Sequence, residues 1–356
     1  MKIIEGGVCA AKGFTANGIH CGIRKEQDHN DLSLIYSEVR ASAAAVYTTN
    51  LVKGAPLDVT RQNISDGFAQ AVICNSGNAN TCNADGIEIA RQMCRIAADE
   101  LGISPEDVVV GSTGVIGQRL SVEPVKAGIK TLAEGLSKNG NDAAAWGIMT
   151  TDTVKKAIAV EFEAGGKTCV IGGMAKGSGM IHPDMATMLA FITSDAAITS
   201  EMLKKALSAD IEESFNMISV DGDTSTNDMV AVLANGMAEN SVIDREGPDF
   251  DSFCSALKTV TTYLAKKMAA DGEGASKLLE CCVSNAKDRQ CAVTVAKSII
   301  CSSLFKAAMF GADANWGRVL CAIGYSKADV DIHKINVSFE SKAGSILVCK
   351  NGAGEE

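Results

Sequence analysis

Apolar residues recur along this chain at two different spacings, and segments of the two kinds follow one another along the sequence. Helical spacing predicts helices at 86–101, 121–137, 200–216, 249–270 and 285–308. Short apolar runs predict strands at 71–74, 107–110, 157–163, 168–172, 189–194, 229–234, 278–284, 335–339 and 345–349. This alternation predicts an α/β fold, but it does not determine the order of the strands in a sheet.

Local signals mark the ends of some predicted helices. Gly102 follows the first helix and is a predicted stop, because glycine adopts the left-handed conformation with little strain. Ser121 and Ser200 are predicted to cap the second and third helices. Cys281 and Cys282 lie in the apolar run LLECCV and are interpreted as residues packed in a strand.

Charge and hydropathy exclude several classes of partner. The formal net charge is −10, and lysine and arginine do not cluster, so nucleic acid is not an expected partner. No apolar run approaches the roughly 20 residues that a membrane helix needs. The N-terminal region MKIIEGGVCAAKGF lacks the apolar core of a signal peptide and the composition of a transit peptide. We therefore expect a cytoplasmic protein without a membrane partner.

Cysteine and histidine usage favours neither a disulfide scaffold nor a metal site. The chain has 13 cysteines, which is an odd number, in 356 residues without a recognisable export signal. Reduced thiols are therefore expected. The four histidines are scattered and no CxxC pair occurs, so no metal is expected.

The segment from Lys176 to Phe191, KGSGMIHPDMATMLAF, places Thr187 directly after the small residue Ala186. If the chain were cut before this threonine, the freed α-amine would lie a few bonds from its own hydroxyl and could serve as its base. An α-amine titrates near pH 8, so it can accept a proton at neutral pH. The string by itself is equally compatible with a glycine-rich turn that leads into the strand LAFITS.

Several further motifs accompany this segment along the chain. They are YTTNLVKGAP at 47–56, CNSGNANTCN at 74–83, GSTGVIG at 111–117, MTTDT at 149–153, SVDGDTSTND at 219–228, DGEGASK at 271–277 and FGADANWGR at 310–318. In this order they resemble the ornithine acetyltransferase family, the glutamate N-acetyltransferases (ArgJ proteins) of arginine biosynthesis. The resemblance covers nearly the whole chain from about residue 8 onward.

The resemblance implies a fold and an activity. The fold would be a layered sandwich of mixed sheets and helices, the self-cleaving DmpA/ArgJ-like fold. Autoproteolysis between Ala186 and Thr187 would yield an α chain, 1–186, and a β chain, 187–356, which intertwine in one fold. The implied activity is ping-pong transfer of acetyl from N-acetylornithine to glutamate through an acetyl-threonine. No cofactor is implied, although some relatives also accept acetyl-CoA as donor, and the implied assembly is a heterotetramer of two α and two β chains.

The motif GSTGVIG provides the expected oxyanion donors. Gly114 permits close backbone approach and an unusual φ, so its N–H can point at a ligand. The resemblance assigns Thr113 and Gly114 to the oxyanion hole. Without the resemblance, the same string is a glycine-rich connection from a strand to a helix.

The expected substrate contacts surround the threonine segment. Lys176 could receive a substrate carboxylate, or it could be a solvated loop lysine. The resemblance assigns substrate binding to Lys176 and Thr150, with Thr151 as the alternative by one register. Asp152, in the same motif, is interpreted as a turn or cap residue rather than a catalytic base.

Glu273 lies between two glycines, so its carboxylate can approach other groups closely. The resemblance assigns Glu273 to the active site, where it would pair with an ammonium group; the alternative is a loop acid at a helix end. The implied catalytic residues are Thr187, Thr113, Gly114 and Glu273, and the implied substrate-binding residues are Thr150, Lys176, Thr187 and Glu273.

Two other polar groupings fit known sites less well. Ser178, His182 and Asp184 lie within seven positions of one loop, whereas catalytic triads are assembled from distant segments. Asp221, Asp223 and Asp228 resemble part of a calcium loop that lacks its final glutamate, and they are expected to shape a loop.

One departure from the family lies at the C-terminal end. The family normally continues beyond the equivalent of Glu356, into a segment whose Asn and Ser/Thr complete the substrate site. The expectation is that part of the pocket is then missing or is supplied otherwise. Two alternatives to the transferase remain. One is a self-cleaving aminopeptidase or amidase of the same architecture that uses water as acceptor. The other, motivated by the C-terminal end, is an inactive, truncated precursor.

Overall fold

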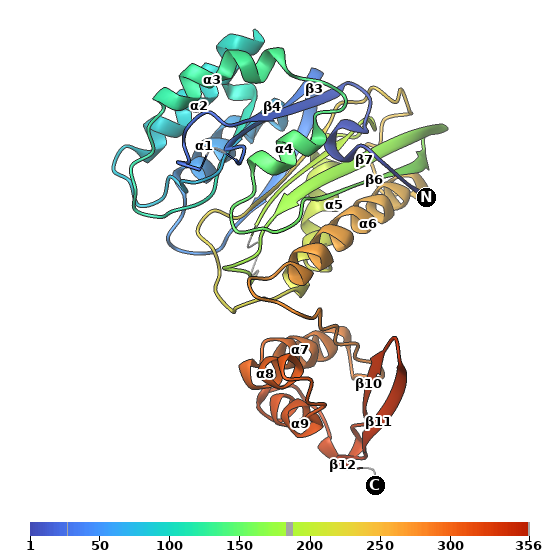
Figure 1. Cartoon of the computed structure of the whole chain (residues 1–356). Helices are drawn as coiled ribbons and strands as arrows, with labels where there is room; N and C mark the ends of the chain where they lie inside the picture. Colours follow the sequence, from blue (N-terminus) through green and yellow to red (C-terminus); the bar gives the residue numbers. More distant parts are fainter. Residues whose placement is uncertain (27, 183–187, 355–356) are drawn as a thin grey trace. The chain divides into compact units, whose positions relative to one another are not determined.

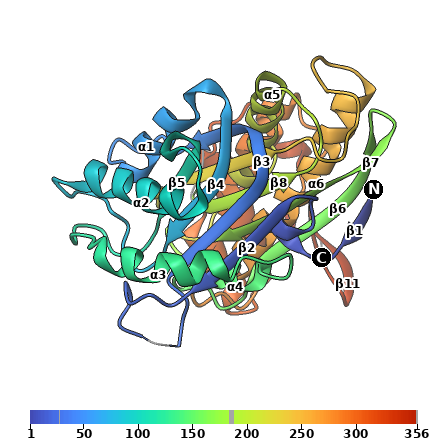
Figure 2. The same cartoon turned by 90° about the horizontal axis from the view of Figure 1, so that it is seen from above.

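The computed structural model describes residues 1–26, 28–182 and 188–354 (Figures 1 and 2). The chain divides into two compact units. Unit 1 comprises Met1–Ile218 and Asp223–Glu273, and unit 2 comprises Ser219–Gly222 and Gly274–Glu356. Each unit is described by itself.

A large mixed sheet forms the centre of unit 1. Within the described residues its strand order is β1-β6-β7-β8-β9-β3-β4-β5, with β2 paired to β3. The strands are β1 (Lys2–Ile4), β2 (Phe14–Ile19), β3 (Leu32–Tyr47), β4 (Phe68–Asn75), β5 (Val108–Ser112), β6 (Lys156–Ala164), β7 (Lys167–Lys176), β8 (Leu189–Ser194) and β9 (Met229–Ala234). The pairs β4–β5 and β8–β9 are parallel, and the other pairs are antiparallel.

Helices cover both faces of this sheet (Figure 2). They are α1 (Ala55–Asn63), α2 (Gly86–Leu101), α3 (Glu123–Glu134), α4 (Asn141–Gly147), α5 (Ser200–Ile211) and α6 (Pro248–Ala270). On β7, Gly173 lies against Val260 of α6, whereas the neighbouring Met174 packs in the cluster that contains Ala144 of α4. Because successive strand residues face opposite sides, α4 and α6 lie on opposite faces. The result is the layered α/β sandwich that the family resemblance implies.

Strand β3 is the longest strand of the sheet and was not predicted. Its first part pairs with β2 and β4, and its second part pairs with β9, with a register shift between Tyr36 and Ala41. The second part, ASAAAVY, is rich in alanine, which favours helices when neighbours are ignored. Pairing on both sides overrides that preference, so this strand depends on tertiary contacts.

The helix predictions hold in unit 1, with adjusted ends. Helix α2 has the predicted bounds, and Gly102 ends it at φ +67°. Helix α5 is shorter than predicted, and its cap is Thr199, whose side chain accepts from Met202 N, so the assignment of Ser200 as cap was wrong by one residue. The N-cap of α3 is Val122, so the assignment of Ser121 as cap was also wrong by one residue, although Ser121 Oγ accepts from Glu123 N at 3.3 Å.

Unit 2 contains three helices and a small sheet among its described residues. The elements are α7 (Arg289–Ile300), α8 (Ser303–Phe310), α9 (Trp316–Tyr325), β10 (Val337–Ser341), β11 (Gly344–Lys350) and β12 (Ala353–Gly354). The helix predicted at 285–308 is therefore two helices. They separate at Ser302, whose side chain accepts from Phe305 N and caps α8.

The strand predicted at 278–284 is wrong, because this segment has no regular secondary structure. In unit 2 the described strands pair only among β10, β11 and β12, so the run has no partner strand. Cys281 packs against the unit 2 core, whereas Cys282 is exposed. Only Leu279, Cys281 and Val283 of this run are partly buried, and they pack against the unit 2 core without a ladder.

Membrane-spanning potential was considered for the helices of the described chain. None of them alone has the length and apolar character to cross a bilayer. The pair α7 and α8, bent by 57° at its break, meets those criteria of length and composition only when both helices are taken together.

Candidate active site

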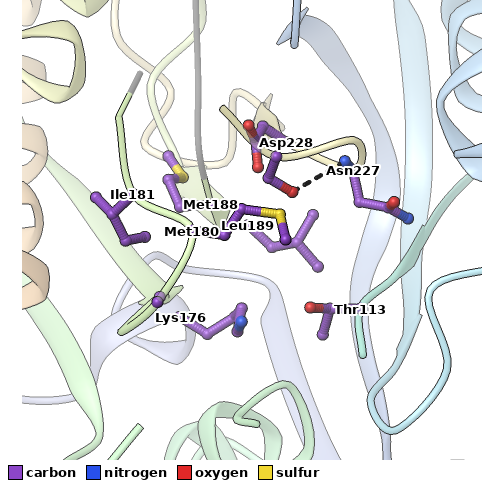
Figure 3. A pocket seen from close by; sticks show the side chains of 11 residues that line it. Thr113, Lys176, Met180, Ile181, Met188, Leu189, Asn227 and Asp228 are labelled. Carbon is purple, nitrogen blue, oxygen red and sulfur yellow. Dashed lines mark hydrogen bonds between the residues drawn. The ribbon is translucent and has the colours of Figure 1, made fainter. Parts of the chain in front are cut away.

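A pocket of about 30 Å³ lies in unit 1 where the ends of β5, β7 and β8 meet the residues that precede β9 (Figure 3). Polar and apolar side chains share its lining. The lining residues are Thr113, Lys176, Gly177, Gly179, Met180, Ile181, Met188, Leu189, Ser225, Asn227 and Asp228. Segments that are far apart in the sequence therefore converge on one space.

The turn after β5 contributes Thr113 and Gly114. Gly114 has φ +131°, and a Cβ there would lie 2.3 Å from the carbonyl carbon of Gly77 and 2.5 Å from Asn78 N. Only glycine fits this position, which confirms the predicted unusual φ. Thr113 lies beside it, is 9% exposed and directs its hydroxyl into the pocket (Figure 3).

Two buried asparagines hold this turn in place. The Ser112 hydroxyl donates to Asn75 Oδ1 at 2.6 Å, and Thr113 N donates to Asn75 O at 3.0 Å. Asn227 Nδ2 donates to the carbonyl oxygens of Ser112, at 3.0 Å, and Ala79, at 2.6 Å. Buried hydrogen bonds of this kind contribute about 1 kcal/mol each, and losing one partner costs more. The segment before β9 therefore locks the turn after β5.

Lys176 is the last residue of β7 and lies inside the pocket rather than in solvent. Its residue exposure is 8%, and its Nζ lies 4.0 Å from Asp152 Oδ2. Burial lowers the pKa of Lys176, whereas the nearby carboxylates of Asp152 and Asp228 act in the opposite direction. The interpretation of Lys176 as a solvated loop lysine is wrong.

A buried ion network lies behind Lys176. Lys156 Nζ is 2.7 Å from Asp152 Oδ1 and 2.6 Å from Asp271 Oδ2, and its side chain is fully buried. Burial works to raise the pKa of Asp152, but Lys176 and Lys156 hold that pKa below its ordinary value. Asp152 also accepts from the backbone N–H of Gly177 at 2.7 Å. The prediction of a turn or cap role for Asp152 was therefore incomplete, since this carboxylate also pairs with a buried lysine.

The same carboxylate positions the MTTDT motif. Thr150 N donates to Asp152 Oδ2 at 3.1 Å, the oxygen that also faces Lys176. Thr150 is half-buried, whereas Thr151 is exposed. This geometry favours Thr150 over Thr151 as the residue near Lys176.

Glu273 lies just beyond α6, beside the segment that lines the pocket. Its N–H donates to Ser178 O at 3.0 Å. A Cβ at Gly179 would lie 2.4 Å from Glu273 Oε1, so the glycine leaves room for the carboxylate. Glu273 itself is exposed and does not line the pocket. The structure thus brings it next to the pocket, at the edge of unit 1.

Ser178 does not have the geometry of a triad nucleophile. It is fully buried, and its hydroxyl donates to the carbonyl oxygen of Asp271 at 2.6 Å. Asp184, Ala186 and Thr187 lie outside the described residues, so the predicted cleavage site and nucleophile are not part of this geometry. Met188 is described and lines the pocket.

Asp228 is the pocket residue that sequence reasoning missed. It is 2% exposed, and its Oδ2 has no hydrogen-bond partner within the part of the chain that the structure describes. Burial raises the pKa of Asp228 well above its ordinary value, against the opposing effects of the Ser225 hydroxyl, Lys176 and the Met188 amide. The available signal was a lone acid directly before the buried run MVAVLA. Its assignment to loop shaping with Asp221 and Asp223 does not describe this position.

The sandwich and its pocket define an enzyme of the α/β class. Its site combines the buried lysine Lys176, the buried carboxyl group of Asp228 and the turn at Gly114. The chain belongs to the ArgJ family, whose profile matches residues 15–356. This confirms the resemblance on which the expected fold and activity rest.

The chain is similar to curated and solved proteins of this family. The "Arginine biosynthesis bifunctional protein ArgJ" of Caldanaerobacter subterraneus subsp. tengcongensis is 49% identical over 354 residues, which cover 99% of this chain and 87% of that protein. A solved ArgJ chain from Bacillus halodurans is 44% identical, with a TM-score of 0.49, and matches 52% of this chain and 97% of its own length. The solved ornithine acetyltransferase of Mycobacterium tuberculosis, in complex with ornithine, is 35% identical, with a TM-score of 0.48. The match covers 52% of this chain and 99% of that chain.

Proposed function

We propose that this protein is the acetyltransferase of arginine biosynthesis that transfers acetyl from N-acetylornithine to glutamate. The observation that carries the proposal is membership of the ArgJ family, at 49% identity to a bifunctional ArgJ protein over 99% of the chain. The pocket supports it, because it combines a cation, a carboxyl group and an oxyanion turn in one small space.

The first half-reaction forms an acetyl ester on Thr187. Its hydroxyl attacks the acetyl carbonyl of N-acetylornithine, and its α-amine, freed by cleavage, takes the hydroxyl proton. The tetrahedral oxyanion receives hydrogen bonds from the Thr113 hydroxyl and the Gly114 N–H. Collapse of the intermediate breaks the amide bond, and the proton passes to the departing amine, so ornithine leaves. The locked turn after β5 supports this role because it fixes both donors before the substrate arrives.

The second half-reaction returns the enzyme to its starting state. The amine of glutamate attacks the acetyl-threonine, the same donors hold the oxyanion, and N-acetylglutamate leaves with the threonine hydroxyl restored. Both amino acids carry a carboxylate, and Lys176 with Thr150 would bind it in each half-reaction. An incoming carboxylate stabilises the charged form of Lys176, which burial disfavours. Glu273, at the pocket edge, would pair with the α-ammonium of Thr187 or with the side-chain amino group of the ornithine substrate.

Self-cleavage between Ala186 and Thr187 is part of the proposal. It would give chains 1–186 and 187–356. Strand β7 precedes the cut and β8 follows it, and the two pair antiparallel. Strand β9, from the second chain, pairs with β3, from the first. These pairs support an intertwined product rather than two separable domains. We extend the proposal to a cytoplasmic heterotetramer of two α and two β chains.

Mass spectrometry of the intact, denatured protein tests cleavage, with Thr187→Ala as the matched variant. We expect two fragments from the wild type that break between Ala186 and Thr187, and one uncut chain from the variant. An uncut wild type would contradict the mechanism and favour an inactive precursor.

Product analysis tests the chemistry. With N-acetylornithine and glutamate, we expect ornithine and N-acetylglutamate in equal amounts. Acetate in place of N-acetylglutamate would instead identify a hydrolase that uses water as acceptor. Replacement of N-acetylornithine by acetyl-CoA in the same assay determines whether the enzyme accepts that donor.

A further inference from the structure

Asp228 carries a carboxylate oxygen that the described part of the fold leaves unused. It is the residue directly before β9, 2% exposed, and its Oδ2 has no hydrogen-bond partner among residues 1–26, 28–182 and 188–354. The Ser225 hydroxyl and the Met188 amide face the same carboxyl group. Buried polar atoms are nearly always paired, so an unpaired one that lines a pocket points to a missing ligand group.

Among the described residues around the pocket, the buried carboxyl groups outnumber the buried lysines by one. Lys156 contacts both Asp152 and Asp271, at 2.7 and 2.6 Å, and Lys176 lies 4.0 Å from Asp152. Two lysines therefore match these two aspartates, and Asp228 is a third buried carboxyl group. An ionised carboxylate in such surroundings is costly unless a cation pairs with it. An ammonium group in the pocket would provide that cation.

The size of the pocket fits the same occupant. A cavity needs roughly 10–15 Å³ to hold one water-sized group. The pocket measures about 30 Å³, so it can take an ammonium nitrogen with the carbon that bears it. Lys176 lines the same space and offers a positive charge to a carboxylate. Figure 3 shows Lys176 and Asp228 around one opening.

We propose that Asp228 binds the free α-ammonium group of the amino-acid substrate, while Lys176 binds its carboxylate. The inference deepens the proposed function and rests on it for the identity of the substrates. Free glutamate and free ornithine carry this ammonium group, whereas their N-acetyl forms carry a neutral amide in its place. Asp228 is therefore the residue that distinguishes the free acceptor from the acetylated product. In the second half-reaction it favours entry of free glutamate and release of N-acetylglutamate.

The test compares two ligands that differ at this nitrogen. Calorimetric titration of the full protein with glutamate and with N-acetylglutamate gives a ratio of dissociation constants, for the wild type and for Asp228→Asn. We expect the variant to bind glutamate about tenfold or more weakly, because hydrogen bonds to charged groups contribute about 1.5–3 kcal/mol. Binding of N-acetylglutamate changes little, since the asparagine oxygen still accepts from an amide N–H.

Asp210→Asn is the matched control. Asp210 is a buried aspartate of α5 whose Oδ1 also has no partner among the described residues, and it does not line the pocket. This variant should leave both dissociation constants unchanged. Steady-state kinetics of the Asp228→Asn variant provide a second measurement. This variant should raise the KM for glutamate and leave the KM for N-acetylornithine nearly unchanged.

Several results would overturn the inference. Equal weakening of both ligands, or a fall in kcat with both KM values intact, would show that Asp228 acts on the site or the nucleophile as a whole. If Asp228→Asn does not fold, the wild type is titrated with glutamate and 2-hydroxyglutarate, and equal affinity for the two contradicts ammonium recognition. Failure of the wild type to make N-acetylglutamate would contradict the proposed function. The ratio of the dissociation constants for glutamate and N-acetylglutamate tests the role of Asp228 independently of that result.

Discussion

Gly114 and Lys176 are constrained by different physical properties of the site. Gly114 has φ +131° and backbone atoms of Gly77 and Asn78 where a Cβ would lie, so its constraint is steric. Lys176 carries a charge in a buried position, so its constraint is electrostatic. A substitution at each position therefore tests a different property of the site.

Gly114→Ala should displace the turn that holds Thr113. The added Cβ would lie 2.3 Å from the carbonyl carbon of Gly77, so backbone must move. Loss of one oxyanion donor typically lowers kcat about 10²–10³-fold, and we expect acetyl transfer to fall by that order. Gly117→Ala is the control, because Gly117 also has a positive φ, +78°, but no atom lies within 4 Å of its Cβ position. Equal loss in both variants, measured by product formation, would contradict the oxyanion role.

Lys176 should make substrate binding sensitive to alkaline pH. Its pKa in the fold lies below the ordinary 10.5, chiefly through burial, so it loses its proton at a pH where a free lysine keeps it. Carboxylate binding needs the charged form, so the dissociation constant for glutamate should rise as pH increases through the lowered pKa. Lys176→Gln should bind weakly at every pH, without this transition. Calorimetric titrations across the alkaline range provide the measurement, and a flat wild-type profile would argue against the assignment.

At the scale of elements, the ion network joins segments that the sheet alone does not join. Lys156 begins β6, Asp271 follows α6, and Asp152 lies in the loop that carries Thr150. Asp271 also accepts from Thr153 N at 3.0 Å. Helix α6, the MTTDT loop and the end of β7 are therefore held in one arrangement behind the pocket.

Asp271→Asn should destabilise unit 1. Removing one partner of a buried pair costs about 3–5 kcal/mol, and the remaining Asp152 contact of Lys156 places the expected loss near 3 kcal/mol. Burial opposes ionisation of Asp271, but Lys156 and Thr153 hold its pKa below the ordinary value. Its contribution is therefore present above about pH 4 and lost as pH falls through the lowered pKa. Urea unfolding at several pH values measures it, and a constant difference down to strongly acidic pH would contradict it.

Asp58→Asn is the control for that series. Asp58 pairs with Arg61 on the exposed surface of α1, at 3.4 Å. Exposed pairs contribute little, so this variant should unfold at nearly the wild-type urea concentration.

The break between α7 and α8 depends on one side chain. Ser302 Oγ accepts from Phe305 N at 3.2 Å and ends the continuous helical pattern. Ser302→Ala should lower the stability of unit 2 by about 1 kcal/mol, the usual value of an N-cap. Ser303→Ala, one residue later and without a cap bond, should change it less. Thermal unfolding distinguishes the two, and equal effects would remove the capping explanation.

At the scale of the whole molecule, strands from both sides of residues 183–187 belong to one sheet, in which β8 and β9 lie together between β7 and β3. β8 lies between β7 and β9, and β9 lies beside β3. Backbone hydrogen bonds and the shared core between these strands join the two parts of the chain.

We therefore expect the fragments of a cleaved chain to remain together. On size-exclusion chromatography in native buffer they should co-elute, and in denaturant they should separate. Elution of the second fragment by itself under native conditions would contradict the intertwined arrangement.

Sequence patterns predicted helices and strands correctly where local signals determine the secondary structure, and less well where pairing partners determine it. Helix α2 carries helical spacing and a glycine stop, and strands β8 and β9 are continuous buried runs, so all three were predicted with their bounds. The run at 278–284 and strand β3 were wrong or missed, because pairing partners decide whether such segments form strands. Motifs also identified Thr113, Gly114 and Lys176, which the fold brings around one pocket or its adjoining turn.

The sequence by itself determined the family, the alternation of helices and strands, and the residue types available for the chemistry. Only the tertiary structure decided which of them meet. Asp228 and Asn227 lie in a polar string before a buried run, and that position does not indicate which distant residues they meet, yet they reach the turn after β5 and the end of β7. Local patterns record propensity and burial. Asp228 lies near Lys176 because β7, β8 and β9 are neighbours in the sheet. Pairing between strands that are distant in the sequence brings these side chains together.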